Sequence, residues 1–117
     1  MPQYMLLLHD NGTFPADISP EEIQGIIQRY MDWRQKVASE GRKITGHKLK
    51  DGEARLLRGK VGAPVVTDGP YAEANEVIGG LFVIEARDYN EVQRLASDCP
   101  HLDFGTIEIR EIEPTRA

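Results

Sequence analysis

The chain has 117 residues, of which 40% are hydrophobic and 28% charged, a composition typical of one globular domain with a single core. Its net charge of −5 argues against nucleic-acid binding, because nucleic-acid binders usually present a basic face. The sequence shows neither a membrane-spanning run nor a signal peptide, and its lone Cys99 cannot form an internal disulfide, so we expect one cytoplasmic domain over residues 1–117, without a membrane partner.

The first part of the chain predicts a strand, a long helix and a second strand. Residues 3–9 form a short apolar run that ends at the turn cluster Asp10-Asn11-Gly12. Ser19-Pro20-Glu21-Glu22 is typical of a helix start, because Ser19 can cap the helix and Pro20 suits its first turn. Apolar residues then recur at helical spacing until Gly41, which predicts an amphipathic helix followed by a strand over residues 43–50.

The second part predicts a hairpin and then another strand, helix and strand. Residues 54–58 and 61–67 form the expected hairpin, with residues 59–62 as its turn. Asp68-Gly69-Pro70 predicts a sharp turn into a polar loop, which leads to an apolar strand over residues 81–86. Asp88 can cap a helix that extends to about Asp98, and the last strand is expected over residues 106–112.

This order of elements predicts an α+β fold of the ferredoxin-like βαββαβ type with an extra hairpin. Residues 5–8 and 81–84 are apolar at every position, as expected for the two central strands of the sheet. Two helices cover only one face of such a sheet, so we expect a second copy to cover the other face, with alternate side chains of both central strands in a homodimer interface. A monomer with a ligand pocket on the open face is the alternative.

Residues 66–73, Val-Thr-Asp-Gly-Pro-Tyr-Ala-Glu, together with residues 76–84 resemble the YCII-related family. They are most similar to its branch named for an Asp-Gly-Pro-Phe (DGPF) motif, with Tyr71 in place of the Phe. The resemblance implies a dimeric α/β-barrel type of ferredoxin-like fold and chemistry without a cofactor. Members of this branch often accompany extracytoplasmic-function sigma factors, which implies a regulatory role. Some relatives carry a His and Asp pair with the His in the first helix, but residues 19–40 contain no His.

Several polar residues are candidates for a functional site. His47, in a strand beside Gly46, and Asp68, at a strand end, are predicted as a catalytic acid/base pair, although Asp68 also suits a purely turn-forming role. His9, Tyr71 and Glu73 are predicted ligand-binding residues, with Glu76 a weaker candidate in the same loop.

Other residues are predicted to be structural. Tyr30 and Trp33 fit the core stripe of the first helix, His101 is expected to face solvent, and Cys99 is expected to be structural. The three His residues lack the spacing of a metal site, and Gly79-Gly80 lacks a phosphate-binding pattern. We therefore expect neither a metal nor a nucleotide cofactor.

The sequence is compatible with two functions. The first is a cofactor-independent enzyme that performs acid/base chemistry on a small aromatic or carbonyl compound. The second is a noncatalytic dimer that binds a ligand or regulates a partner, linked by the resemblance to sigma-factor signalling. Fold analogy does not decide between them.

Overall fold

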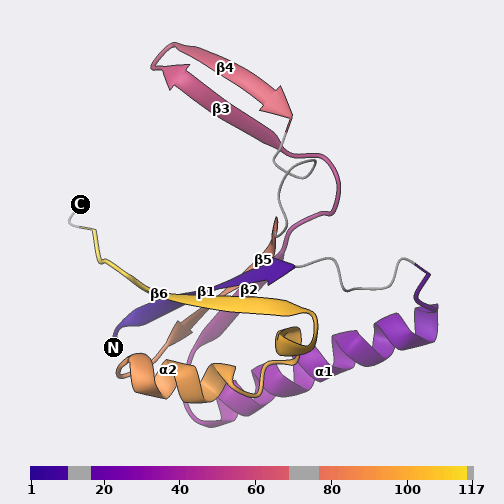
Figure 1. Cartoon of the computed structure of the whole chain (residues 1–117). Coiled ribbons are helices and arrows are strands. Elements are labelled where there is room, and N and C mark those ends of the chain that lie inside the picture. The colour runs from indigo at the N-terminus through magenta and orange to yellow at the C-terminus, as the bar shows by residue number, and fades with distance from the viewer. Residues whose placement is uncertain (11–16, 69–76, 116–117) are drawn as a thin grey trace.

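The computed structural model describes residues 1–10, 17–68 and 77–115. Within these ranges the elements follow in the order β1 (Gln3–Asp10), α1 (Pro20–Ser39), β2 (Ile44–Lys48), β3 (Arg55–Lys60), β4 (Ala63–Asp68), β5 (Val77–Glu85), α2 (Tyr89–Ala96), the short 3-10 helix η2 (Pro100–Asp103) and β6 (Gly105–Ile112). Figure 1 shows this arrangement.

Four strands form one antiparallel sheet in the order β2-β5-β1-β6. The first strand and the apolar strand before α2 are its two central strands, as predicted from their uninterrupted apolar runs. Leu6 of β1 lies opposite Phe82 of β5 on one side and Ile109 of β6 on the other. This strand order, with both helices on one face, confirms the expected α+β ferredoxin-like architecture.

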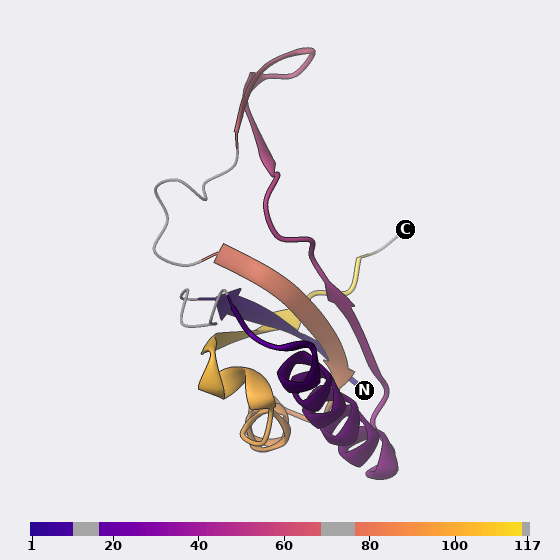
Figure 2. The same cartoon turned by 90° about the vertical axis from the view of Figure 1, so that its right-hand side faces the viewer.

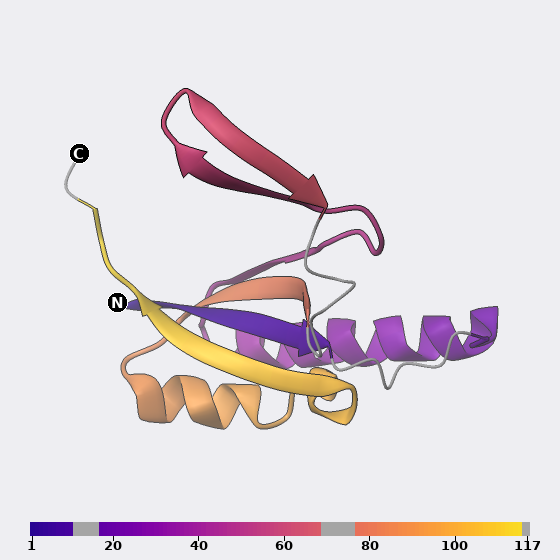
Figure 3. The same cartoon turned by 45° about the horizontal axis from the view of Figure 1, so that its top comes forward.

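Helices α1 and α2 pack on the same face of the sheet (Figures 1 and 3). Alternate residues of the central strands point into this layer, because successive side chains of a strand point to opposite faces. The core is formed by buried side chains from both layers, which include Tyr4, Leu6, Leu8, Trp33, Val37, Phe82, Ile84, Val92 and Leu95. The indole N–H of Trp33 donates to the Leu95 carbonyl at 2.9 Å, which ties the two helices together.

The starts of both helices and the end of α1 form as the sequence predicts. The Glu22 backbone N–H donates to the Ser19 hydroxyl at 3.1 Å, and the Glu91 N–H donates to the Asp88 carboxylate at 2.9 Å. Gly41 follows the end of α1 with a φ of 79°, a left-handed conformation that glycine adopts without steric cost. None of the described helices is both long and apolar enough to cross a bilayer.

A buried ion-pair cluster links α2 to the segment that follows α1. The Glu91 side chain is 3% exposed, and its carboxylate accepts hydrogen bonds from Arg42 at 2.7 and 3.0 Å and from the Arg87 side chain at 2.8 Å. The Arg87 backbone N–H adds a further bond at 3.0 Å. These hydrogen bonds, led by that of Arg42, lower the pKa of Glu91 to about 2.

The hairpin β3–β4 is a separate two-stranded sheet that extends away from the main sheet on the side opposite the helices (Figures 1 and 2). Its turn is shorter than predicted, since β3 reaches Lys60 and β4 begins at Ala63. Gly59 and Gly62 have φ angles of 110° and 83°, so these two positions supply the left-handed conformations the tight turn requires. All residues of β4 are exposed.

Strand β2 is shorter than the predicted residues 43–50, and two other segments also differ from the sequence prediction. Strand β5 begins at Val77, four residues before the predicted start at residue 81, because Val77, Ile78 and Gly80 pair with β1 across a bulge at Gly79. A Cβ on Gly80 would lie 3.0 Å from the His47 carbonyl oxygen, so this glycine allows close strand packing. After α2, which ends at Ala96, the chain forms the 3-10 helix η2 instead of a plain loop.

Candidate functional site

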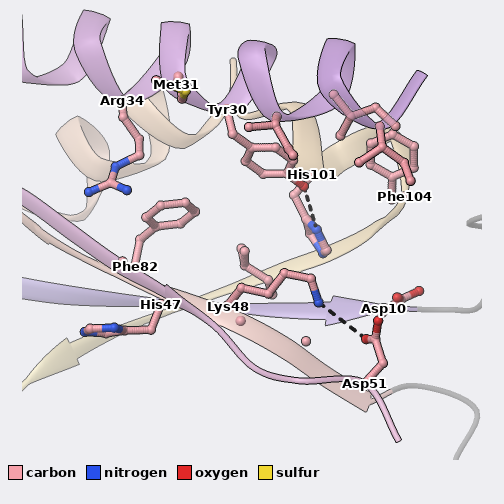
Figure 4. Close-up of a pocket in the computed structure, with 17 residues that line it drawn as sticks. Asp10, Tyr30, Met31, Arg34, His47, Lys48, Asp51, Phe82, His101 and Phe104 are labelled. Carbon is pink, nitrogen blue, oxygen red and sulfur yellow. Dashed lines mark hydrogen bonds and ion pairs between the residues drawn. The ribbon is translucent and has the colours of Figure 1, made fainter. Parts of the chain in front are cut away.

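A pocket with a volume of about 430 Å³ lies between α1 and one end of the main sheet (Figure 4). One wall comes from the first four turns of α1, whose lining residues are Ile23, Ile26, Ile27, Tyr30, Met31 and Arg34. The volume falls within the range of small-molecule sites, which are usually apolar with a few placed polar groups.

The sheet side of the pocket is built around Phe82. Its ring stands up from β5 toward α1 (Figure 4) and meets Trp33 edge-on, with ring centroids 5.0 Å apart. Gly46 of β2 lies directly opposite Phe82 in the register, and a Cβ there would overlap the Phe82 ring. The Phe82 ring can therefore occupy this position only because Gly46 has no side chain.

The apolar stripe of α1 serves two purposes along its length. Trp33 and Val37, in the C-terminal half, are 4% and 1% exposed and belong to the core. Ile23 and Ile27, in the N-terminal half, are 38% and 44% exposed and line the pocket. Tyr30 lies between these groups and is half-buried. The prediction of a core stripe is therefore confirmed for Trp33, whereas Tyr30 also lines the pocket.

His101 is buried, which corrects the expectation that it faces solvent. Its ring is held between β1 and α1 because Nε2–H donates to the His9 carbonyl at 2.9 Å, while Nδ1 accepts from the Tyr30 hydroxyl at 3.3 Å. A carbonyl only accepts, so this bond places the proton on Nε2 and leaves Nδ1 as an acceptor. His101 is the second residue of η2, which begins at Pro100, and the sequence gives no signal that this short helix folds back on the sheet.

Burial raises the pKa of Tyr30 to about 12, because the phenolate would lose its hydration. Tyr30 is therefore protonated at neutral pH and can act as a hydrogen-bond donor. Both Tyr30 and His101 line the pocket. Together they place a phenol and an imidazole beside a mainly apolar cavity.

The charged residues of the pocket are arranged asymmetrically. Arg34 lies on α1 with its guanidinium 5.7 Å from the centroid of the Phe82 ring. Lys48, Asp51 and Asp10 lie at the other side of the pocket (Figure 4). The Lys48 ammonium is 3.4 Å from the Asp51 carboxylate, so these two charges largely offset each other.

The predicted catalytic pair lies on two different sheets. His47 is among the residues that line the pocket, but it lies on β2 opposite Leu81, so strand alternation directs its side chain to the face away from the helices. Asp68 is the exposed last residue of β4 in the hairpin. Within the described ranges, no hydrogen bond or ion pair joins His47 to Asp68. Asp68 ends its strand as predicted, and the catalytic roles of both residues stay predictions.

The predicted ligand-binding residues are also dispersed. His9 accompanies Glu108 on the far side of the sheet from the helices, where its Nε2 is 2.9 Å from the Glu108 carboxylate. Tyr71, Glu73 and Glu76 lie outside the described residues. Arg34, Phe82 and His101 are pocket residues that the sequence did not mark as functional, because their proximity depends on the packing of three separate elements.

No cluster of three or more potential metal ligands occurs among the residues described here. Cys99, immediately before η2, is buried in the core, and burial raises its pKa to about 11. The site is thus an apolar cavity with a hydroxyl, an imidazole and several charged groups. Its chemistry suits binding of a small organic molecule.

The family model of the YCII-related domain matches residues 2–116. The chain belongs to the YCII-related domain family. None of the curated proteins matches it. Among solved structures, this YCII-related domain is similar to the protein At3g17210 from Arabidopsis thaliana, with 14% sequence identity, a TM-score of 0.46, and coverage of 100% of this chain and 98% of the other.

Proposed function

We propose that this YCII-related domain binds a small, mainly apolar molecule in the pocket between α1 and the sheet. The observation that carries this proposal is the N-terminal half of α1, where Ile23 and Ile27 are left partly exposed toward a cavity instead of being packed in the core. Exposed large apolar side chains that line a concave site are typical of ligand binding. The dispersal of His47, Asp68 and His9 favours binding over acid/base catalysis by those residues.

The test is to fill the pocket without touching its polar groups. Replacing Ile27 with Trp adds bulk to the pocket wall, and we expect it to abolish binding of 2-naphthamide, a neutral bicyclic probe, in isothermal titration calorimetry. The control is Gln24→Trp, which adds the same side chain to an exposed position of the same helix. Equal binding by the wild type and Ile27→Trp would refute the proposal, and so would a wild type that binds neither 2-naphthamide nor the corresponding acid, 2-naphthoate.

A second candidate function, proton-transfer catalysis, is supported by the contact between Tyr30 and His101. When the Tyr30 hydroxyl turns to donate to a ligand carbonyl oxygen, the lone pair of His101 Nδ1 is freed to accept an α-proton from the ligand. The enolate that forms is stabilised by the Tyr30 hydrogen bond until Nδ1 returns the proton to carbon. The test is deuterium uptake from D2O by 2-acetylnaphthalene, an apolar ketone with exchangeable α-protons. Uptake that is accelerated by the wild type and lost in Tyr30→Phe would support catalysis, and its absence leaves binding as the sole role of the pocket.

The proposal includes a homodimer formed through the sheet face opposite the helices. On that face Met5 and Leu7 of β1 lie beside Val83 and Leu81 of β5, and all four are half-buried in the single chain. The chain exposes 8663 Å², about 2,300 Å² more than the roughly 6,400 Å² expected for a compact protein of this mass. A stable interface buries about 800 Å² per partner, so a second copy can account for a large part of the excess.

The hairpin β3–β4 belongs to the same proposal. Leu57, Val65 and Val66 are 64%, 62% and 54% exposed, and a two-stranded hairpin without other contacts is only marginally stable in water. The Cα radius of gyration is 16.4 Å, against about 13.4 Å for a compact domain of this length. We propose that the hairpin packs against the second copy, which would give a dimeric α/β-barrel type of assembly.

Assignment to the DGPF branch is a further part of the proposal. It is supported by the sequence Asp68-Gly69-Pro70-Tyr71, of which the structure describes only Asp68, at the end of β4. The branch implies a regulatory alternative, in which the dimer acts on a sigma factor. A two-hybrid assay against the sigma factor encoded nearest its gene tests this alternative, with interaction expected if the role is regulatory.

A further inference from the structure

The pocket has one half-buried cation that no carboxylate neutralises among the described residues. Arg34 lies on the pocket side of α1, and its guanidinium faces the Phe82 ring at 5.7 Å. Among the described residues, the Arg34 side chain contacts the Phe82 ring but forms no hydrogen bond or ion pair. Its forked N–H donors are therefore available to a ligand.

Other arginines of the chain contrast with Arg34. Arg29, on the same helix, donates to the Asp103 carboxylate at 2.6 Å, and Arg42 forms a bidentate pair with Glu91. Arg94 likewise pairs with Glu40 at 2.9 Å. Arg34 thus differs from these three in facing an apolar pocket instead of a carboxylate.

We infer that the ligand of this pocket is a small apolar carboxylic acid whose carboxylate binds Arg34 and whose apolar body lies against Phe82, Ile27 and Met31. The inference rests on the proposed binding function and names the ligand class. A planar guanidinium matches a carboxylate through two parallel N–H···O bonds. The ring of Phe82 beneath the guanidinium holds it in place by cation–π attraction and shields one side from water.

The charges that line the pocket determine the orientation in which the ligand binds. Arg34 lies at one side of the pocket, and Asp10 and Asp51 lie at the other (Figure 4). Lys48 also lies on that side, but Asp51 largely offsets its charge, so a carboxylate is attracted more strongly to Arg34. Two cationic side chains, Arg34 and Lys48, line the pocket among the described residues, and Lys48 is paired with Asp51. One guanidinium without a carboxylate partner in a mainly apolar wall favours a monoanion over a phosphate dianion, which usually binds to several cationic or backbone N–H donors.

The experiment compares 2-naphthoate with 2-naphthamide, which share a ring system and differ in charge. Isothermal titration calorimetry with the full chain at neutral pH measures both affinities in the wild type, Arg34→Gln, Arg34→Lys and Arg29→Gln. We expect the wild type to bind the acid about tenfold or more tightly than the amide. Arg34→Gln should bind the acid and the amide with similar affinities, Arg34→Lys should retain part of the preference, and Arg29→Gln should retain all of it.

The outcomes separate this inference from the proposed function. Equal affinities of the wild type for the acid and the amide, or an acid preference that survives in Arg34→Gln, would overturn the inference and leave the binding pocket intact. Absence of binding of both compounds to the wild type would overturn the proposed function and the inference together. Circular dichroism of each variant verifies that a loss of affinity does not come from unfolding.

Discussion

Gly46 of β2 lies against the ring of Phe82, so closely that a Cβ at Gly46 would overlap two carbon atoms of the ring. This relationship predicts that Gly46→Ala displaces Phe82 from its edge-on contact with Trp33 and narrows the pocket. Overpacking of this kind costs about 1–3 kcal/mol of stability. We expect a lower free energy of unfolding in urea and weaker binding of 2-naphthamide.

The control for this variant is Gly25→Ala. A Cβ at Gly25 on α1 meets no atom within 4 Å, and replacing Gly with Ala inside a helix stabilises it by about 0.5–1 kcal/mol. The two Gly→Ala changes should therefore shift stability in opposite directions. An unchanged stability and affinity in Gly46→Ala would show that Phe82 has room to move.

We expect the chain to dimerise through the open face of the main sheet, and we expect one charged residue introduced there to disrupt the dimer. Val83 lies opposite Met5 and Thr45 near the centre of this face, so Val83→Asp would place a carboxylate in the proposed interface. We expect sedimentation velocity to show a dimer for the wild type and a monomer for Val83→Asp. Gln24→Asp, on the exposed side of α1, should remain dimeric, and a monomeric wild type would contradict the proposal.

Because Glu91 forms buried ion pairs, we expect the folded chain to lose stability at acidic pH. Its pKa is lowered from the ordinary value of 4.5 to about 2 in the folded chain, so the folded state favours the ionised form. The resulting stability is fully present above about pH 4.5 and is lost as the pH falls from 4.5 toward 2. Urea unfolding across this range should show that Glu91→Gln is less stable than the wild type at pH 7 and that the difference shrinks toward pH 2.

The matched control for Glu91 is Glu53→Gln. Glu53 pairs with Arg55, but both side chains are largely exposed, at 78% and 68%, and exposed pairs contribute little to stability. We expect the unfolding free energy of this variant to follow that of the wild type at every pH. A constant difference between wild type and Glu91→Gln from pH 7 to pH 2 would contradict the proposed role of the buried cluster.

Cys99 is predicted to be unreactive in the folded protein. Burial raises its pKa from 9.0 to about 11, which lowers the thiolate fraction at pH 8 by about a hundredfold, and the thiolate is the reactive form. Labelling with iodoacetamide should be slow in the native chain and fast in guanidinium chloride. Introducing a second thiol with Ala38→Cys, at an exposed position of α1, provides a reference rate, and equal labelling of both thiols would refute the prediction.

Local sequence signals predicted much of the fold. Ser19, Asp88 and Gly41 mark helix ends through hydrogen bonds or backbone conformations that involve only near neighbours. The central position of β1 and β5 could be predicted because strands covered on both faces are apolar throughout. The hairpin was expected too, but its separation from the main sheet depends on long-range packing that no short segment encodes.

The site was less predictable from sequence. Ile23 and Val37 belong to the same apolar stripe of α1, and their spacing does not distinguish a pocket wall from the core. His101 follows a proline in a polar segment, and its burial results from hydrogen bonds to His9 and Tyr30, which are distant in the chain. For His47, strand alternation places the side chain on one face, but the sequence does not show which face the helices cover.

The most direct test of the account is a crystal structure of the protein grown with 2-naphthoate. We predict electron density for the naphthyl ring between α1 and Phe82, with the carboxylate at Arg34 and a second copy packed on Leu7 and Val83. Ligand density on the sheet face opposite the helices, with the α1 pocket unoccupied, would contradict it.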